Sequence, residues 1–248
     1  MRLDSGTPAF LTGSYGFLID ASFSDTLNGH GFSLLGVMNF DSAGNASGPY
    51  TVQTGASGGQ PAQTVTGTFT GTSSLNPDRT GSVTVALDAG ITAQFSIVTT
   101  DGGSAIQMVL TNCSGGCDIS GTLVRGSARL VYTGGLSGSF GFALNNAPMP
   151  LGTLGVMSFD GAGNVSMSYN SVSTGGDPNQ PPMSSGTLTG TYTQNGDGTG
   201  TIAWPAQAGL AAPAAFAIAV TDSGAGIFLL KTNGASDGNV SSGTARLQ

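Results

Sequence analysis

The stretch Leu35-Gly-Val-Met-Asn-Phe-Asp-Ser-Ala-Gly-Asn45 occurs a second time, nearly unchanged, as Leu154-Gly-Val-Met-Ser-Phe-Asp-Gly-Ala-Gly-Asn164. Four other blocks also repeat, in the same order along the chain, with offsets of 117 to 125 residues. They are Gly13–Phe17 with Gly138–Phe142, Gly67–Thr72 with Gly186–Thr191, Ala93–Ile97 with Ala214–Ile218, and Gly126–Leu130 with Gly243–Leu247. Chance similarity does not preserve five blocks in order, so the chain is an internal duplication. We assign residues 1–133 to the first module and 134–248 to the second.

Within each copy the hydrophobic pattern has a period of two. In Val65–Thr72 every second residue is Thr, and in Gly81–Asp88 the apolar residues alternate with polar ones. Such alternation indicates strands with one dry and one wet face. It predicts eight strands in the first copy, near 13–23, 32–40, 46–53, 64–73, 81–87, 92–100, 104–111 and 119–131. In the second copy it predicts strands near 138–145, 153–159, 165–172, 186–194, 199–204, 214–221, 226–232 and 240–247. The spacing leaves no room for crossover helices, so the pairing is expected to be antiparallel.

The connections indicate how these strands are arranged. The second, fourth and sixth connections of each copy are tight and rich in Asp, Asn and Gly, as in Asp41–Asn45 and Asp160–Asn164. The others are mostly longer and differ between the copies. In an up-and-down meander this places the tight turns at one end and the variable loops at the other. Closure into a barrel removes the exposed edges, so we predict an all-β chain of two eight-stranded antiparallel barrels. Two β-sandwiches are the alternative.

The composition restricts the possible partners. The net charge is −7 with only six Lys and Arg, which argues against binding to nucleic acid or to anionic lipid. All thirteen acidic residues are Asp, and only 8% of the chain is charged. No apolar run is long enough for a transmembrane helix. Cys113 and Cys117 flank a short Ser-Gly-Gly turn, which favours a disulfide over a metal site. A disulfide in turn implies an extracellular or periplasmic location.

Catalytic chemistry has little support in the sequence. His30 is the only histidine, and it lies in a Gly-rich loop with no counterpart in the second copy, so a Ser-His-Asp triad is not expected. Nearly every Asp lies at a turn or strand end, where local hydrogen bonding explains it. The Asp41–Asn45 and Asp160–Asn164 segments are interpreted as hairpin turns and not as calcium loops. We therefore expect no enzyme, no metal and no cofactor.

Apolar residues that match between the copies form the expected core. They are Tyr15/Phe140, Phe17/Phe142, Met38/Met157, Phe40/Phe159, Phe69/Leu188, Phe95/Phe216 and Ile97/Ile218. Several glycines share the inward face: Gly36, Gly67, Gly71, Gly186 and Gly190. They either allow the barrel to curve or leave its interior unfilled, and the sequence does not separate the two.

The longer loops contain an unusual share of apolar residues. The segment Trp204–Pro213 includes the only Trp and also Leu210, while Met149 lies between two prolines and Met183 follows two prolines. Exposed apolar clusters mark contact sites more often than chance. His30, Met149, Met183, Trp204 and Leu210 are therefore the candidate binding residues.

The blocks Gly-x-Tyr/Phe-x-Phe, Phe-Asp-x-x-Gly-Asn and Gly-Thr-Tyr/Phe-Thr resemble an uncharacterised repeat of secreted bacterial β-rich proteins. The predicted meander is similar in general shape to calycin and avidin barrels. This resemblance covers nearly the whole chain, but it rests on turn and core residues, so it implies a fold and no site residues.

The sequence thus predicts an exported, non-enzymatic binding protein that uses its loop-rich barrel ends or interior. The expected partner is a small apolar ligand or the surface of another protein or cell. One alternative is a self-associating structural subunit of a surface layer, adhesin or filament, which would make the chain a homo-oligomer. Another is a single sixteen-stranded membrane pore, against which the Thr-rich outer faces argue.

Overall fold

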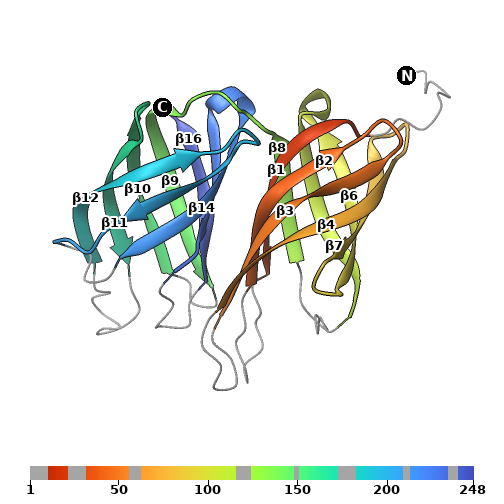
Figure 1. Cartoon of the computed structure of the whole chain (residues 1–248), viewed down its shortest axis with the longest axis horizontal. Helices are drawn as coiled ribbons and strands as arrows, with labels where there is room; N and C mark the ends of the chain where they lie inside the picture. Colours follow the sequence, from red (N-terminus) through yellow and green to blue (C-terminus); the bar gives the residue numbers. More distant parts are fainter. Residues whose placement is uncertain are drawn as a thin grey trace.

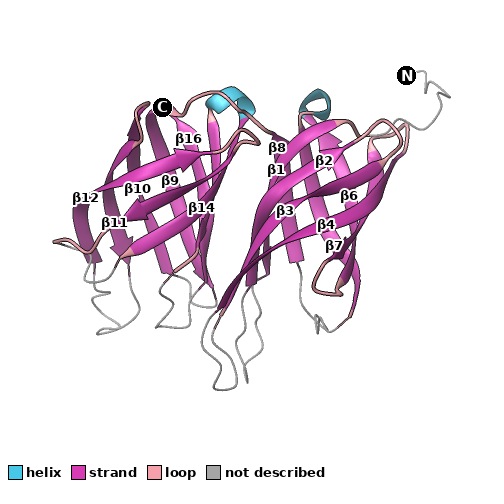
Figure 2. Ribbon diagram, in the orientation of Figure 1, coloured by secondary structure: helices cyan, strands magenta, loops and turns pink. Residues whose placement is uncertain are grey.

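The structure, a computed structural model, describes residues 11–21, 32–55, 63–115, 124–147, 151–172, 183–208, 213–233 and 240–248. Nearly all of this is β-strand, with two single-turn 3₁₀ helices, η1 (Asp101–Gly103) and η2 (Asp222–Gly224) (Figure 2). No helix in these ranges has the length and hydropathy of a membrane span.

Eight strands form each of two closed barrels (Figure 1). The first contains β1 (Gly13–Ala21), β2 (Phe32–Phe40), β3 (Asn45–Thr54), β4 (Gln63–Leu75), β5 (Thr80–Leu87), β6 (Thr92–Thr100), β7 (Ala105–Ser114) and β8 (Val124–Leu130). The second contains β9 (Ser137–Ala147), β10 (Leu151–Asp160), β11 (Asn164–Val172), β12 (Met183–Gln194), β13 (Thr199–Trp204), β14 (Ala214–Thr221), β15 (Gly226–Lys231) and β16 (Val240–Leu247).

Within each barrel every strand pairs antiparallel with its neighbours in sequence, and the first strand closes on the last. The predicted pair of up-and-down eight-stranded barrels is therefore confirmed, and the two-sandwich alternative is wrong. The single sixteen-stranded barrel is also wrong, because β8 hydrogen-bonds to β1 before the second module begins. The tight connections of each barrel lie at one end, as the meander requires, and in the two barrels these ends point to the same side of the molecule (Figure 1).

The hairpin between β2 and β3 shows why the repeated sequence forms this turn. Asp41 Oδ1 accepts the backbone N–H groups of Ala43 and Asn45 at 2.9 and 2.8 Å, and its Oδ2 accepts the Asn45 amide at 2.7 Å. Asp160 and Asn164 repeat the arrangement in the second barrel, with distances of 2.6 to 2.9 Å. These hydrogen bonds, those to the Asn45 and Asn164 amides foremost, lower the pKa of both carboxyl groups. Local hydrogen bonding thus occupies both carboxylates.

Each barrel has its own apolar core, built from the inward-facing residues of all eight strands. All seven predicted matched pairs, Tyr15/Phe140 to Ile97/Ile218, are buried. Leu11 and Leu136, which precede β1 and β9 at equivalent positions, are buried in the same two cores and were not predicted.

Two inward-facing glycines, one in each barrel, receive an aromatic ring from the neighbouring strand. Phe17 pairs with Gly36, and its ring would lie 2.9 Å from a Cβ added there. Phe142 and Gly155 repeat this contact at the same distance. At Gly36 and Gly155 an aromatic ring therefore occupies the space that a side chain would take.

Candidate functional site

Trp204 ends β13 with its side chain in the core of the second barrel. It is 2% exposed and packs edge-to-face on Phe216, with 5.5 Å between the ring centroids. The equivalent residue of the first barrel is Val85, while Leu188 replaces the larger Phe69 two positions before the facing glycine. The same part of the core is thus filled by a larger Phe69 and a smaller Val85 in the first barrel, and by a smaller Leu188 and a larger Trp204 in the second.

The indole N–H of Trp204 has no acceptor. Its Nε1 atom is buried and without a hydrogen-bond partner in the described part of the chain. The adjacent ring atom, Cδ1, would lie 2.7 Å from a Cβ at Gly190, so this edge of the indole packs against the bare backbone of β12. A buried donor without an acceptor costs about 1–3 kcal/mol, and buried indole N–H groups usually have a partner.

Trp204 and Gly190 line a depression of about 920 Å³. Its wall comes from residues of the five strands β10 to β14, together with Pro205, Pro213 and Asn233 of the adjoining connections. A volume of this size is in the range of small-molecule sites. The lining includes inward-facing residues such as Phe159 and outward-facing residues such as Ser158. The depression therefore extends along the barrel wall and is not confined to the interior.

Two side-chain amides fix the margin of this depression. Gln207 accepts the Thr189 N–H at 3.0 Å and donates to the Thr189 carbonyl at 2.9 Å, so its amide pairs with β12 as a strand backbone would. Asn233 accepts the Ala215 N–H and donates to the Pro213 carbonyl at 3.0 Å. These bonds tie both ends of the connection between β13 and β14 to the barrel.

The cavity inside the first barrel is much smaller than the depression on the second barrel. A cavity of about 40 Å³ lies between Phe17, Tyr50, Phe69 and neighbouring apolar residues. It is large enough for roughly one water molecule and too small for an organic ligand. For the described residues, a ligand inside this barrel is therefore not supported.

A groove of about 510 Å³ lies between the barrels, lined by residues of β2, β3 and β4 on one side and of β13, β14 and the turn before β13 on the other. Tyr50, which lines it, donates its hydroxyl to Asp88 Oδ1 at 2.8 Å. Burial, followed by this hydrogen bond, raises the pKa of Tyr50 to about 12. The Thr68 N–H, followed by Tyr50, lowers the pKa of Asp88. Tyr50 and Asp88 are thus engaged with each other, and neither is a free acid or base.

The predicted binding residues are not brought together as a set. His30, Met149 and Leu210 lie outside the described residues, and Met183 begins β12, with its side chain outside the description. Cys117 lies outside them too, so the disulfide with Cys113 stays a prediction. Trp204 is buried in the core and is not part of an exposed apolar cluster. Gly190, Gln207 and Asn233 were not among the predicted binding residues, although Gln207 lies within the predicted apolar segment Trp204–Pro213.

No cluster of three or more His, Cys, Asp or Glu side chains that could hold a metal occurs among the described ranges. The interpretation of the Asp-rich segments as turns is supported by the local N–H groups that bind the carboxylates of Asp41 and Asp160.

Comparison with known proteins gives no family. No family model matches the sequence, and no curated protein matches it. Three solved structures are similar at low TM-scores. A double mutant of transferrin binding protein B (TbpB) from Haemophilus parasuis has 8% identity and a TM-score of 0.29, covering 96% of this chain and 76% of that one. Rv2717c from M. tuberculosis has 16% identity and a TM-score of 0.25, covering 72% and 89%. CghA with Sch210972 has 10% identity and a TM-score of 0.21, covering 96% and 89%. At these values the three structures do not assign the chain to a family.

Proposed function

We propose that this chain is an exported, non-enzymatic binding protein whose second barrel binds a small, mainly apolar molecule carrying one hydrogen-bond acceptor. The proposal rests on two observations: Trp204 lines the 920 Å³ depression, and the Nε1 of the same indole is buried without a hydrogen-bond partner, so that a ligand reaching it would have to enter beside the ring. An acceptor on the ligand would complete the hydrogen bonding of the indole. The first barrel, which has Val85 at this position, would serve as a scaffold.

The surroundings of Trp204 support an apolar ligand. Pro205, Pro213 and Ala214 offer carbon surface, and the Gln207 and Asn233 amides are largely engaged with the backbone at the margin. A ligand that buries apolar area here gains roughly 25 cal/mol per Å² before the cost of its own immobilisation. A charged ligand would lose its hydration without a matching charge, because Asp160 is the only ionisable residue of the described lining.

The proposal that the protein is not an enzyme is supported by the structural roles of its Asp side chains. Asp41, Asp78, Asp160 and Asp197 each bind backbone N–H groups in their own turns, so none is available as a general base. An extracellular or periplasmic location is supported by the predicted disulfide and by the low charge, with Thr and Ser taking the place of ionic surface residues.

The test uses Trp204 as its own reporter, because it is the only tryptophan of the chain. A medium-chain methyl ketone and the alkane of equal length differ only in one acceptor. The ketone is expected to shift Trp204 emission and to bind several-fold more tightly than the alkane, since one net hydrogen bond contributes about 0.5–1.5 kcal/mol. By calorimetry, Trp204→Phe should reduce ketone affinity to that of the alkane.

A matched pair of variants locates the site. Ala215→Phe places a ring at the lining of the depression and should abolish binding, while Gln94→Phe, at the equivalent position of the first barrel, should leave it unchanged. Equal affinity of the ketone for wild type and Ala215→Phe would overturn the proposed site. Native mass spectrometry of the protein from an exporting host would show whether a molecule is retained.

A further inference from the structure

The two barrels contact each other through different faces. The first contributes the outer face of β1 and β2, and the second contributes the outer faces of β14, β15 and β16. Their apolar side chains form one buried cluster of Leu18, Leu35, Ala217, Ala219, Phe228, Leu230 and Val240. An isolated bridge between Val131 and Thr221 and the hydrogen bond from Tyr132 N–H to the Val220 carbonyl extend the contact. The contact is therefore heterologous, because each copy uses a surface that the other does not.

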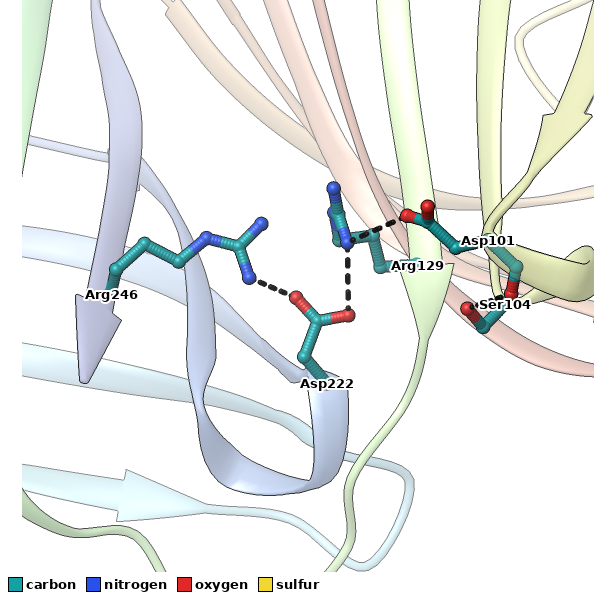
Figure 3. Close-up of polar contacts among 5 residues, drawn as sticks. All are labelled: Asp101, Ser104, Arg129, Asp222 and Arg246. Atoms are coloured by element: carbon teal, nitrogen blue, oxygen red, sulfur yellow. Dashed lines mark hydrogen bonds and ion pairs between the residues drawn. The ribbon is translucent and has the colours of Figure 1, made fainter.

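Polar groups frame this cluster. Asp20 Oδ1 accepts the hydroxyl of Ser242 of the second barrel at 2.6 Å, and Thr64 donates to the Thr232 carbonyl at 2.7 Å. At the end with the tight turns, Arg129 of β8 lies 3.3 Å from Asp222 of the second barrel (Figure 3). Apolar burial with oriented polar contacts around it is the composition of a specific interface.

Because the barrels are copies, each half of this interface exists twice. The equivalent of the β1–β2 face is the β9–β10 face of the second barrel, and the equivalent of the β14–β15 face is the β6–β7 face of the first. Leu35 is 2% exposed, but its equivalent Leu154, at an offset of 119, is 61% exposed. Ala219 and Leu230 are fully buried, but their equivalents at an offset of 121, Val98 and Val109, are 46% and 40% exposed. Half of the six exposed large hydrophobic residues of the described chain thus lie on these two unused faces.

The charges are also duplicated at the required places. Arg246, the equivalent of Arg129, is 49% exposed next to the β9–β10 face, and Asp101, the equivalent of Asp222, is 60% exposed next to the β6–β7 face. If a second molecule repeated the internal contact, Arg246 of one chain would approach Asp101 of the next, as Arg129 approaches Asp222 within the chain (Figure 3).

We propose that copies of this chain associate head to tail, with the β9–β10 face of one molecule binding the β6–β7 face of the next. The occupant of each free face is thus a second copy of this chain, in the geometry that already joins its two barrels. A heterologous contact of this kind leaves one face of each kind free after every addition, so association gives linear oligomers, or rings where the rotation closes.

The contact between molecules is expected to be weaker than the one within the chain. Ser96 and Gln107 stand where the internal interface has Ala217 and Phe228, so less apolar area is buried between chains. The association should therefore be reversible and should depend on protein concentration. The association does not require the ligand site, although β10 takes part in both: Ser158–Asp160 at its end line the depression, and Leu154 lies on the docking face.

Sedimentation velocity and light scattering across a micromolar to millimolar series of the whole protein test the proposal. The mean mass of the wild type should rise with concentration. Leu154→Asp and Val109→Asp should each keep the protein monomeric, because each blocks one of the two faces. Thr70→Asp, at an exposed residue of β4 outside both faces, is the control and should associate like the wild type. Circular dichroism confirms that each variant folds.

Mixing the two blocked variants gives the decisive measurement. Each retains the face that the other lacks, so an equimolar mixture of Leu154→Asp and Val109→Asp should form dimers and nothing larger. A wild type that stays monomeric at every concentration would overturn the proposal. So would a mixture that does not dimerise, or a Val109→Asp variant that dimerises alone, since the latter would indicate a symmetric contact.

Discussion

Arg129 in β8 and Asp222 in η2 form an ion pair between the barrels, although each has an equivalent partner within its own barrel. Asp222 also binds Arg246, and Arg129 lies 3.7 Å from Asp101 (Figure 3). The carboxylate of Asp222 is thus shared between the second barrel and the first, whereas Asp101, at the equivalent position, serves the first barrel only.

We expect Asp222→Asn to lower the free energy of unfolding by about 1 kcal/mol in low salt, and by less in high salt, because these groups are partly exposed. Asp101→Asn is the control and should change stability little, since its carboxylate is more exposed and more distant from the guanidinium. A double-mutant cycle of Asp222→Asn with Arg129→Ala, measured by urea denaturation, isolates the contribution of the pair between barrels. Zero coupling would show that the pair adds nothing.

Gly16 lies where β1 approaches the second barrel most closely. A Cβ at this position would be 2.9 Å from Thr221 Cγ2 and 3.1 Å from Ala219 Cβ. Gly16→Ala should therefore weaken the contact between barrels and lower stability by about 1–2 kcal/mol. At the equivalent Gly141 a Cβ would meet only the flexible end of Gln248, so Gly141→Ala should be nearly neutral. Equal denaturant midpoints for the two variants would contradict this explanation.

Arg79 occupies a left-handed backbone conformation, with φ of 70°, in the turn between β4 and β5. The second barrel has Gly198 there, with φ of 80°. The left-handed region costs a non-glycine residue about 1–2 kcal/mol. Glycine removes this cost but loses more backbone entropy on folding, so we expect Arg79→Gly to raise the free energy of unfolding by up to about 1 kcal/mol. The reverse change, Gly198→Arg, should destabilise it, because a Cβ would also lie 2.3 Å from Val131 Cγ1. Thermal denaturation of both variants checks the two signs.

The exchange of large and small core residues predicts a rescue. Trp204→Val should lower the free energy of unfolding by about 3 kcal/mol, because it leaves a cavity beside Phe216. Adding Leu188→Phe gives the second barrel the combination that the first already uses in Phe69 and Val85, and it should restore at least half of the loss. Urea denaturation followed by circular dichroism measures both. If the double variant is no more stable than the single one, the two barrels do not fill this region equivalently.

The acid side of the stability profile should depend on the turn carboxylates. The pKa values of Asp41 and Asp160 are lowered by hydrogen bonds from Asn45 and Asn164. A lowered pKa in the folded state means that the contribution is fully present above the unfolded value of about 4 and is lost as the pH falls through the folded value. The free energy of unfolding should therefore decline below about pH 4, and the double variant Asp41→Asn with Asp160→Asn should decline less steeply. Parallel profiles for wild type and variant would contradict this assignment.

Much of the fold could be predicted because the determinants are local. Alternation specifies which face of each strand is buried, and the Asp41–Asn45 type of turn specifies where strands reverse. The contact between barrels could not be predicted in this way. Leu35 and Leu154 are the same residue in the same repeated block, yet one is buried and the other exposed. Only the placement of the second barrel against the first distinguishes them.

The candidate site was predicted only in part for a similar reason. Trp204 stood out as the single tryptophan next to an apolar loop, but its burial depends on Gly190 and Phe216, which come from other strands. The Gln207 amide pairs with a strand backbone, and no sequence pattern signals such a contact. The burial of Trp204 and the pairing of the Gln207 amide therefore depend on contacts between residues that are distant in the sequence.

The tight turns of both barrels face the same side of the molecule, and the strand ends that carry the longer connections face the opposite side together (Figure 1). One molecule thus presents two separate rims, one on each barrel, that face the same direction, while the barrels are joined through the buried cluster between them. A large target that touched both rims would be held bivalently, so two individually weak contacts would reinforce each other through their high effective concentration. Divergence of the loops between the copies would then broaden recognition without disturbing either core.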